Sequence, residues 1–259
     1  MSQVEVLISA MNQNGPSIFR QTNIQSSALM VNQCDVNDYW EQKLEFGTIR
    51  IFSTKDRGLS RSRNMAVENA SKKYALLCDD DEYLYKDYPQ LIETAFADNP
   101  KADVICFQVK CPGKKYSSKS FKLGYITTLR IASWQICFRL ESVRKANIVF
   151  DTRFGSGTVM GSGEENIFLY DCLKNGLNIY YVPICIGEVS RKKSNWFKGF
   201  TQTYFFNRGK ILRRMMGSFW GGVYCVYFVI AKHRRYKKET NFANACKNIV
   251  KGFFSWSEK

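Results

Sequence analysis

The stretch GLSRSRNMAVENASKKYALLCDDDE, residues 58–82, determines which fold the sequence indicates. Apolar side chains recur on one face of residues 59–70, which predicts a helix, and the apolar run of residues 74–78 predicts a buried strand. Four consecutive acids, Asp79 to Glu82, follow that strand directly. Adjacent carboxylates repel one another, so their clustering at a strand end raises the question of which cation they hold.

Further strands and helices alternate on both sides of this stretch. The predicted strands are residues 4–10, 28–32, 48–52, 103–109, 134–140 and 178–183, and the other predicted helices are residues 17–27 and 163–176. This alternation is typical of an open α/β sheet.

Polar side chains follow three of the predicted strands at the point where each strand ends. They are Asn12 and Gln13, Asn32 to Asp35, and Asp79 to Glu82. Ligands of open α/β sheets bind beyond the carboxyl ends of the strands. If these strands are parallel, we expect the three polar groups to lie along one edge of the sheet.

Composition argues against several other kinds of protein. Nine cysteines occur without any CxxC pair, which argues against a disulfide framework and a zinc site and favours a reduced, cytosolic compartment. Residues 1–15 lack the pattern of a signal peptide. The one histidine, His233, lies in a basic run, which argues against Ser-His-Asp chemistry and multi-histidine metal sites.

Charge divides the chain into a nearly neutral body and a basic tail. Residues 1–189 contain 22 Lys and Arg against 21 Asp and Glu, whereas residues 190–259 contain 16 against 2. The tail also holds 16 of the 38 aromatic residues. We therefore expect a catalytic domain in residues 1–189 and a basic, amphipathic helical tail in residues 190–259.

An uncharged run of 17 residues, 215–231, lies in the tail between basic flanks. As a helix it would measure roughly 25 Å, short of the ~30 Å hydrocarbon core of a bilayer. We predict that residues 196–238 lie on an anionic membrane with this run inserted. A buried core helix with basic ends is the alternative. We expect no nucleic-acid partner, because the tail shows no RNA-recognition motif, helix-turn-helix or zinc ligand set.

The spacing of the acids suggests a divalent metal site. Asp79 and Asp81 are two residues apart, so in an extended chain both side chains face the same way. Alternation directs Asp80 and Glu82 away, and we expect these two to contribute less. Mg²⁺ and Mn²⁺ prefer oxygen ligands and usually share them with substrate phosphates. The alternatives are an acidic surface loop and a phosphatase-type DxDx[TV] nucleophile, which would need Thr or Val in place of Tyr83.

Four segments in order resemble family 2 glycosyltransferases of the GT-A fold, of the type that builds bacterial surface polysaccharides. VLISAMN resembles the first strand of the family, LMVNQCD its second strand end, residues 58–82 its Arg-Asn helix and Asp-x-Asp motif, and GSGEENIFLYDCLKNGLNIYYVP its Glu-Asp helix. The resemblance extends over most of residues 4–185. It implies a Rossmann-like, nucleotide-binding GT-A domain with a mixed, mainly parallel sheet.

The resemblance also implies a site for a nucleotide sugar, usually a UDP sugar. Ser9 and Met11 would lie beside the nucleoside, and Asn32 stands where the family often has an aspartate that contacts the base. Arg63 would approach the nucleotide or its diphosphate, with a surface cation as the alternative role. Asp79 and Asp81 would hold Mn²⁺ or Mg²⁺. Asp80 is counted with the donor-binding residues.

The same resemblance makes Glu165 the base that deprotonates the acceptor hydroxyl, with Glu164 beside it. The alternative is structural, because Ser162 and Glu165 have the spacing of an S-x-x-E capping box. The glycine-rich residues 153–163 before them are interpreted either as a flexible wall of the acceptor site or as an ordinary loop.

Together these observations predict an inverting, metal-dependent transfer of one sugar from a nucleotide sugar to a hydroxyl of a lipid-linked glycan. We expect this reaction at the cytoplasmic face of the cell membrane, in the biosynthesis of a capsule, O-antigen or exopolysaccharide. A nucleotidyltransferase of similar fold is the enzymatic alternative. A basic membrane- or nucleic-acid-binding protein without activity is the other.

Overall fold

The structure, a computed structural model, describes residues 1–189 and 199–257 in two compact units, Met1–Lys193 and Ser194–Lys259. The predicted boundary at residue 190 and the first three residues of the predicted membrane segment, 196–198, lie outside the described residues. Each unit is described by itself below.

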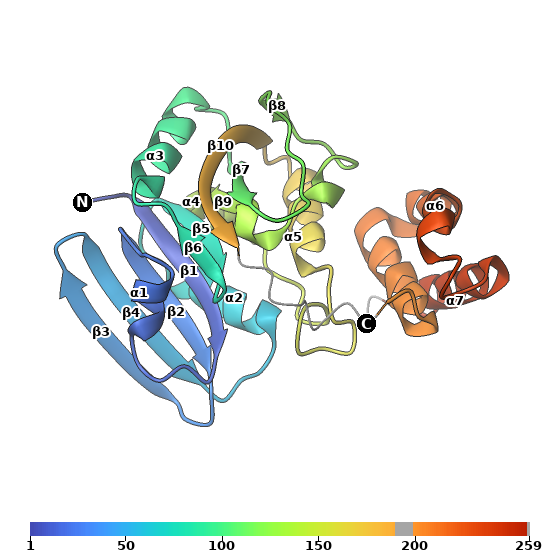
Figure 1. Ribbon diagram of the computed structural model, residues 1–259, viewed down its shortest axis with the longest axis horizontal. Helices are drawn as coiled ribbons and strands as arrows, with labels where there is room; N and C mark the ends of the chain where they lie inside the picture. The colour runs from blue at the N-terminus through green and yellow to red at the C-terminus, as the bar shows by residue number, and fades with distance from the viewer. Residues whose placement is uncertain (190–198, 258–259) are drawn as a thin grey trace. The chain divides into compact units, whose positions relative to one another are not determined.

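The first unit is built on one large mixed sheet (Figure 1). Its strands are β1 (Val4–Met11), β2 (Ser27–Gln33), β3 (Asp38–Leu44), β4 (Gly47–Thr54), β5 (Tyr74–Asp79), β6 (Glu82–Leu84), β7 (Val104–Lys110), β8 (Phe121–Lys122), β9 (Ile136–Arg139) and β10 (Ile179–Val189). The strand order is β3-β4-β2-β1-β5-β9-β7-β10-β6, and β8 pairs with β10 beside this path. The pairs β1–β2, β1–β5, β2–β4 and β7–β10 are parallel, and the remaining pairs are antiparallel. The predicted mixed, mainly parallel α/β fold is confirmed.

Helices cover both faces of this sheet and enclose two apolar cores. The helices are α1 (Ser17–Gln21), α2 (Leu59–Asn69), α3 (Tyr88–Asp98), α4 (Leu140–Lys145) and α5 (Glu164–Lys174), with short 3₁₀ turns η1 (Thr128–Arg130) and η2 (Ser133–Gln135). One core joins alternate sheet residues such as Val6 and Ile8 to α1 and α3. The other joins Leu7 and Leu77 to α2, α4 and α5. Because successive side chains of a strand point to opposite faces, the apolar runs of the central strands serve both cores.

Several elements differ from the sequence-based expectation. The helix predicted over residues 17–27 ends at Gln21, since residue 22 onwards turns and β2 already begins at Ser27. Strand β3, helix α3 and strand β6 were not predicted. Every residue of β3 is at least partly exposed, so it lacks the apolar alternation that marks a strand.

The second unit is helical, as predicted, and consists of α6 (Gln202–Tyr236) and α7 (Phe242–Phe254). Helix α6 is interrupted at Gly217, whose backbone has φ 72° and ψ −166°. The uncharged run 215–231 is therefore not one continuous helix, which corrects the expectation. A glycine adopts this left-handed conformation without the steric cost that other residues have. Among the residues described, no helix combines the length and apolarity that crossing a bilayer requires.

Candidate active site

The carboxyl ends of three parallel strands meet at one edge of the sheet, as the strand ends predicted. Ser9 of β1 lies opposite Val31 of β2 on one side and Asp79 of β5 on the other. The Ser62 hydroxyl of α2 donates a hydrogen bond to Ser9 Oγ at 2.9 Å. Both serines are buried, so this pair ties the first turn of α2 to the strand edge that carries the acids.

Arg63 lies at the centre of the site and is buried, with 2% of its side chain exposed. Its Nη2 donates to Asp79 Oδ1 at 3.0 Å, and its Nη1 donates to Glu164 Oε1, also at 3.0 Å. Burial opposes the charged guanidinium, but the carboxylates of Asp79 and Glu164 outweigh this and raise the pKa of Arg63. Arg63 is thus no surface cation. It joins two acids that come from β5 and α5.

Asp79 accepts hydrogen bonds on both carboxylate oxygens. Oδ1 accepts from Arg63, and Oδ2 accepts from the Ser133 hydroxyl of η2 at 3.1 Å. Strand β5 ends at Asp79, and Asp80 and Asp81 form the turn that leads into β6. The strand alternation expected to separate Asp79 and Asp81 from Asp80 and Glu82 therefore does not apply, because the chain stops being extended.

Glu82 is the acid that departs most from expectation. It is 3% exposed, and its Oε1 accepts the backbone N–H of Asp79 at 2.7 Å. Burial, with a smaller contribution from the charge of Asp79, raises the pKa of the Glu82 carboxyl well above its usual value. Its Oε2 is buried without a hydrogen-bond partner. Glu82 thus closes the turn at the end of β5, a role that the run of four acids alone does not reveal.

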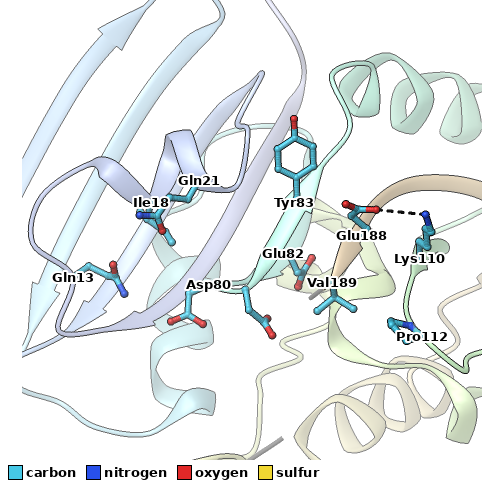
Figure 2. A pocket seen from close by; sticks show the side chains of 11 residues that line it. Gln13, Ile18, Gln21, Asp80, Glu82, Tyr83, Lys110, Pro112, Glu188 and Val189 are labelled. Atoms are coloured by element: carbon cyan, nitrogen blue, oxygen red, sulfur yellow. Dashed lines mark ion pairs between the residues drawn. The ribbon is translucent and has the colours of Figure 1, made fainter. Parts of the chain in front are cut away.

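A cavity of about 710 Å³ opens beside the acidic turn. Figure 2 shows Asp80 and Glu82 facing it from the turn, with Gln13 and Gln21 on one side and Glu188 on the other. The remaining lining residues are Ile18, Asp81, Tyr83, Lys110, Pro112 and Val189. Amide and carboxylate groups dominate the polar lining, and such groups suit the hydroxyls of a sugar. Lys110 Nζ and Glu188 Oε2 lie 3.9 Å apart at its exposed rim.

Asn32 holds the loop that follows β1. Its Oδ1 accepts from the Gln13 backbone N–H, and its Nδ2 donates to the Gln13 carbonyl, both at 2.9 Å. The neighbouring Gln33 accepts from the Gly58 N–H through Oε1 at 2.7 Å. Met11, 53% exposed, stands at the end of β1 beside these residues. The predicted nucleoside contacts of Ser9, Met11 and Asn32 remain predictions. Asn32 also stabilises the loop after β1 through its hydrogen bonds to the Gln13 backbone.

Glu164 and Glu165 open α5, where the glycine-rich loop ends. The N-cap of α5 is Gly163, in a left-handed conformation, and no side chain caps the helix. The Ser162–Glu165 capping box is therefore not formed, which corrects that interpretation. Glu164 is buried and leaves Oε2 without a hydrogen-bond partner, whereas Glu165 is partly exposed.

The glycine-rich loop is fastened to the first turn of α2. The Leu59 N–H donates to the Ser156 carbonyl at 2.9 Å, and the Ser60 hydroxyl donates to the Phe154 carbonyl at 2.7 Å. A Cβ on Gly155 would lie 3.1 Å from Ser60 Oγ and 3.3 Å from the carboxyl carbon of Glu164. The loop thus packs against Glu164, and no pattern in the sequence predicts these contacts.

The acids partly fit a divalent metal. No set of three or more His, Cys, Asp or Glu in residues 1–189 and 199–257 is arranged as a complete site. Mg²⁺ is usually held by one or two carboxylates together with waters and substrate phosphates, so a complete set is not required. Asp79 is 27% exposed, and Asp81 lies exposed two residues on. Both carboxylates fit a metal whose shell the substrate completes.

Comparisons with known proteins agree with this fold. A family model described as "Glycosyl transferase family 2" matches residues 7–160. S. aureus TarS 1–349 in complex with UDP-GlcNAc aligns with TM-score 0.64 and 12% identity over 96% of this chain and 81% of that chain. The mannosyltransferase PcManGT from Pyrobaculum calidifontis, in complex with GDP-Man and Mn²⁺, aligns with TM-score 0.52 and 9% identity over 100% and 88%. No curated protein matches the chain.

Proposed function

Because the chain belongs to glycosyl transferase family 2, we propose that it moves one sugar from a nucleotide sugar to an acceptor hydroxyl with inversion at the anomeric carbon. The observation that carries this proposal is the ion-pair bridge from Asp79 through Arg63 to Glu164. It brings the acids after β5 and the acids that open α5 to one place, where donor and acceptor chemistry have to meet.

The donor would bind along the edge formed by β1, β2 and β5. Ser9, Met11 and Asn32 would border the nucleoside, and Asp80 would face the sugar-diphosphate. Asp79 and Asp81 would hold Mn²⁺ or Mg²⁺, which stabilises the negative charge that develops on a departing nucleoside diphosphate. The guanidinium of Arg63, which is positively charged and lies beside Asp79, would also stabilise this negative charge.

Glu165 would act as the base toward the acceptor hydroxyl, and Glu164 would position it. Two observations support this division. Glu164 is buried and accepts a hydrogen bond from Arg63, whereas the next residue, Glu165, is partly exposed and so can be reached by an acceptor. The alternative capping role of Glu165 is ruled out because the N-cap residue of α5 is Gly163 and not Ser162. A base acts within hydrogen-bond reach of the proton it takes.

For the acceptor we propose a lipid-linked glycan of a surface polysaccharide, glycosylated at the cytoplasmic face of the cell membrane. Two features support it: the cavity beside Asp80 and Glu82, whose lining suits a saccharide, and the basic, aromatic C-terminal unit. A single addition is proposed because the chain lacks the Q-x-x-R-W motif of processive relatives.

A donor screen tests the proposal. Purified protein is incubated with UDP and GDP sugars and Mn²⁺ or Mg²⁺, and the released nucleotide is measured together with the anomeric configuration of the product. UDP-GlcNAc and GDP-Man are the first candidates, because structural neighbours bind them. Release of a nucleoside diphosphate with an inverted product supports the proposal. Release of pyrophosphate would instead indicate nucleotidyl transfer and overturn it.

A further inference from the structure

The second half of α6 exposes a continuous apolar stripe. It consists of Phe219, Trp220, Val223, Val226, Tyr227 and Ile230, which are between 50% and 71% exposed. Their spacing of three and four residues places all six on one face of the helix. A contiguous exposed patch of large apolar side chains marks a surface that binds a partner.

The opposite face of the same helix already packs inside the second unit. Cys225, Phe228 and Val229 are buried. A Cβ on Gly221 would lie 2.8 Å from the Leu212 carbonyl oxygen, so the two halves of α6 approach closely beyond the break at Gly217. The core of this unit therefore uses one side of the uncharged run and leaves the apolar stripe outside it.

Cations continue the line of the apolar stripe. Arg234 and Lys237 follow Ile230 by four and seven residues, and both are exposed. Arg234 lies on the same face of α6, and Lys237 is the C-cap residue that continues this line in a helical conformation. Glu239 is the one acidic residue of the sequence 199–257, and its Oε2 accepts the Phe200 backbone N–H at 2.7 Å. The positive charge at the end of the stripe is thus poorly balanced by acids of its own unit.

We propose that the apolar stripe docks into the headgroup region of an anionic lipid bilayer, with the second half of α6 in the membrane plane and Arg234 and Lys237 on lipid phosphates. Twelve residues of helix measure roughly 18 Å, which suits lying in an interface and not spanning. Phe219, Trp220 and Tyr227 are residue types that favour this interface.

Flotation of the full chain with vesicles tests this docking. Vesicles of phosphatidylcholine alone are compared with vesicles that also contain phosphatidylglycerol. Replacing Val226→Gln and Ile230→Gln should lower the partition coefficient about tenfold or more on anionic vesicles. Replacing Arg234→Gln and Lys237→Gln should lower the partition coefficient about tenfold on anionic vesicles at low salt. The partition coefficient on neutral vesicles should stay unchanged.

A matched control replaces two equally exposed aliphatic residues of the first unit, Val36→Gln and Ile126→Gln. This variant should float as the unchanged protein does. Equal flotation of the stripe variant and the control would overturn the proposal. So would a stripe variant that floats normally but dissociates from dimer to monomer in light scattering. Since flotation requires no sugar transfer, its outcome is independent of the proposed function.

Discussion

Arg63 donates a hydrogen bond to Glu164 at 3.0 Å, although 101 residues separate them in the chain. The same guanidinium donates a second hydrogen bond to Asp79 Oδ1, also at 3.0 Å. A planar guanidinium offers donors in a fixed fork, so it can hold two carboxylates at a set distance from each other. The spacing of the acidic groups at this edge therefore depends on one arginine.

Replacing Arg63→Met should destabilise the protein by about 3 kcal/mol, because it leaves buried carboxylates without their partner. Arg63→Lys should keep the charge but lose one of the two bonds, and transfer should fall at least tenfold. Urea unfolding and nucleotide release measure the two effects. Arg61→Lys, on the exposed side of the same helix, is the control and should change neither. A stable, fully active Arg63→Lys protein would contradict the bridging role.

Replacing Asp81→Asn should abolish transfer without loss of stability, because Asp81 is exposed on a turn. Titration calorimetry should then show that Mn²⁺ no longer strengthens binding of the nucleotide. Asp87→Asn, also exposed and six residues away, is the matched control. Undiminished transfer by the original protein in excess EDTA would refute the metal role altogether.

Replacing Glu165→Gln should lower turnover by at least ~10²-fold, the usual scale for a general base, while donor affinity stays unchanged. Because Glu165 does not cap the helix, the free energy of unfolding of this variant should change by less than ~0.5 kcal/mol. Glu164→Gln should instead lower the free energy of unfolding by roughly 1.5–3 kcal/mol, through its weakened bond to Arg63. Single-turnover kinetics separate the two residues, and normal turnover of Glu165→Gln would move the base elsewhere.

Glu82 should make stability depend on pH. Its pKa is raised in the folded protein, so the folded state holds a proton that the unfolded state releases. Stability should therefore fall as pH rises from the usual glutamate value through the raised one. Glu82→Gln keeps an acceptor for the Asp79 N–H and should remove this loss. Urea unfolding between pH 4.5 and 8 measures it, and Glu68→Gln, exposed, should behave as the unchanged protein.

Replacing Gly155→Ala should reduce transfer, because its Cβ would meet Ser60 and the carboxyl group of Glu164. Gly161→Ala is the matched control, since Gly161 also has a positive φ but open space around its Cβ position. Both variants should lose roughly 1–2 kcal/mol of stability from the backbone conformation. Only Gly155→Ala should lose activity, and equal activities would argue against contact between the loop and Glu164.

Periodicity and strand-end polarity were sufficient to predict the α/β fold and the gathering of Gln13, Asn32 and Asp79 at one edge of the sheet. Those signals are local, and a strand with a buried apolar run carries them within a few residues. The bridge from Arg63 to Glu164 is not local, because it depends on how α5 packs against α2. The hydrogen bond from Ser133 to Asp79 could not be predicted for the same reason, because 54 residues separate them in the chain.

Local rules also failed where the chain turns. Alternation assumes an extended backbone, and the chain leaves that conformation at Asp80, so the orientation of Glu82 was misjudged. The S-x-x-E pattern at Ser162 assumes that the serine is the N-cap residue of the helix, but the N-cap residue is Gly163. In the same way, the uncharged run 215–231 reads as one segment, whereas Gly217 divides it.

The two margins of the sheet bear on how the protein avoids aggregation. An edge strand offers unpaired backbone groups on which another chain can build. At one margin β3 carries Asp38, Glu41 and Lys43, so a strand added there would have to accommodate charges of both signs. At the other margin β6 is only three residues long. The acids of the active site thus lie beside an edge strand that offers another chain only three residues on which to pair.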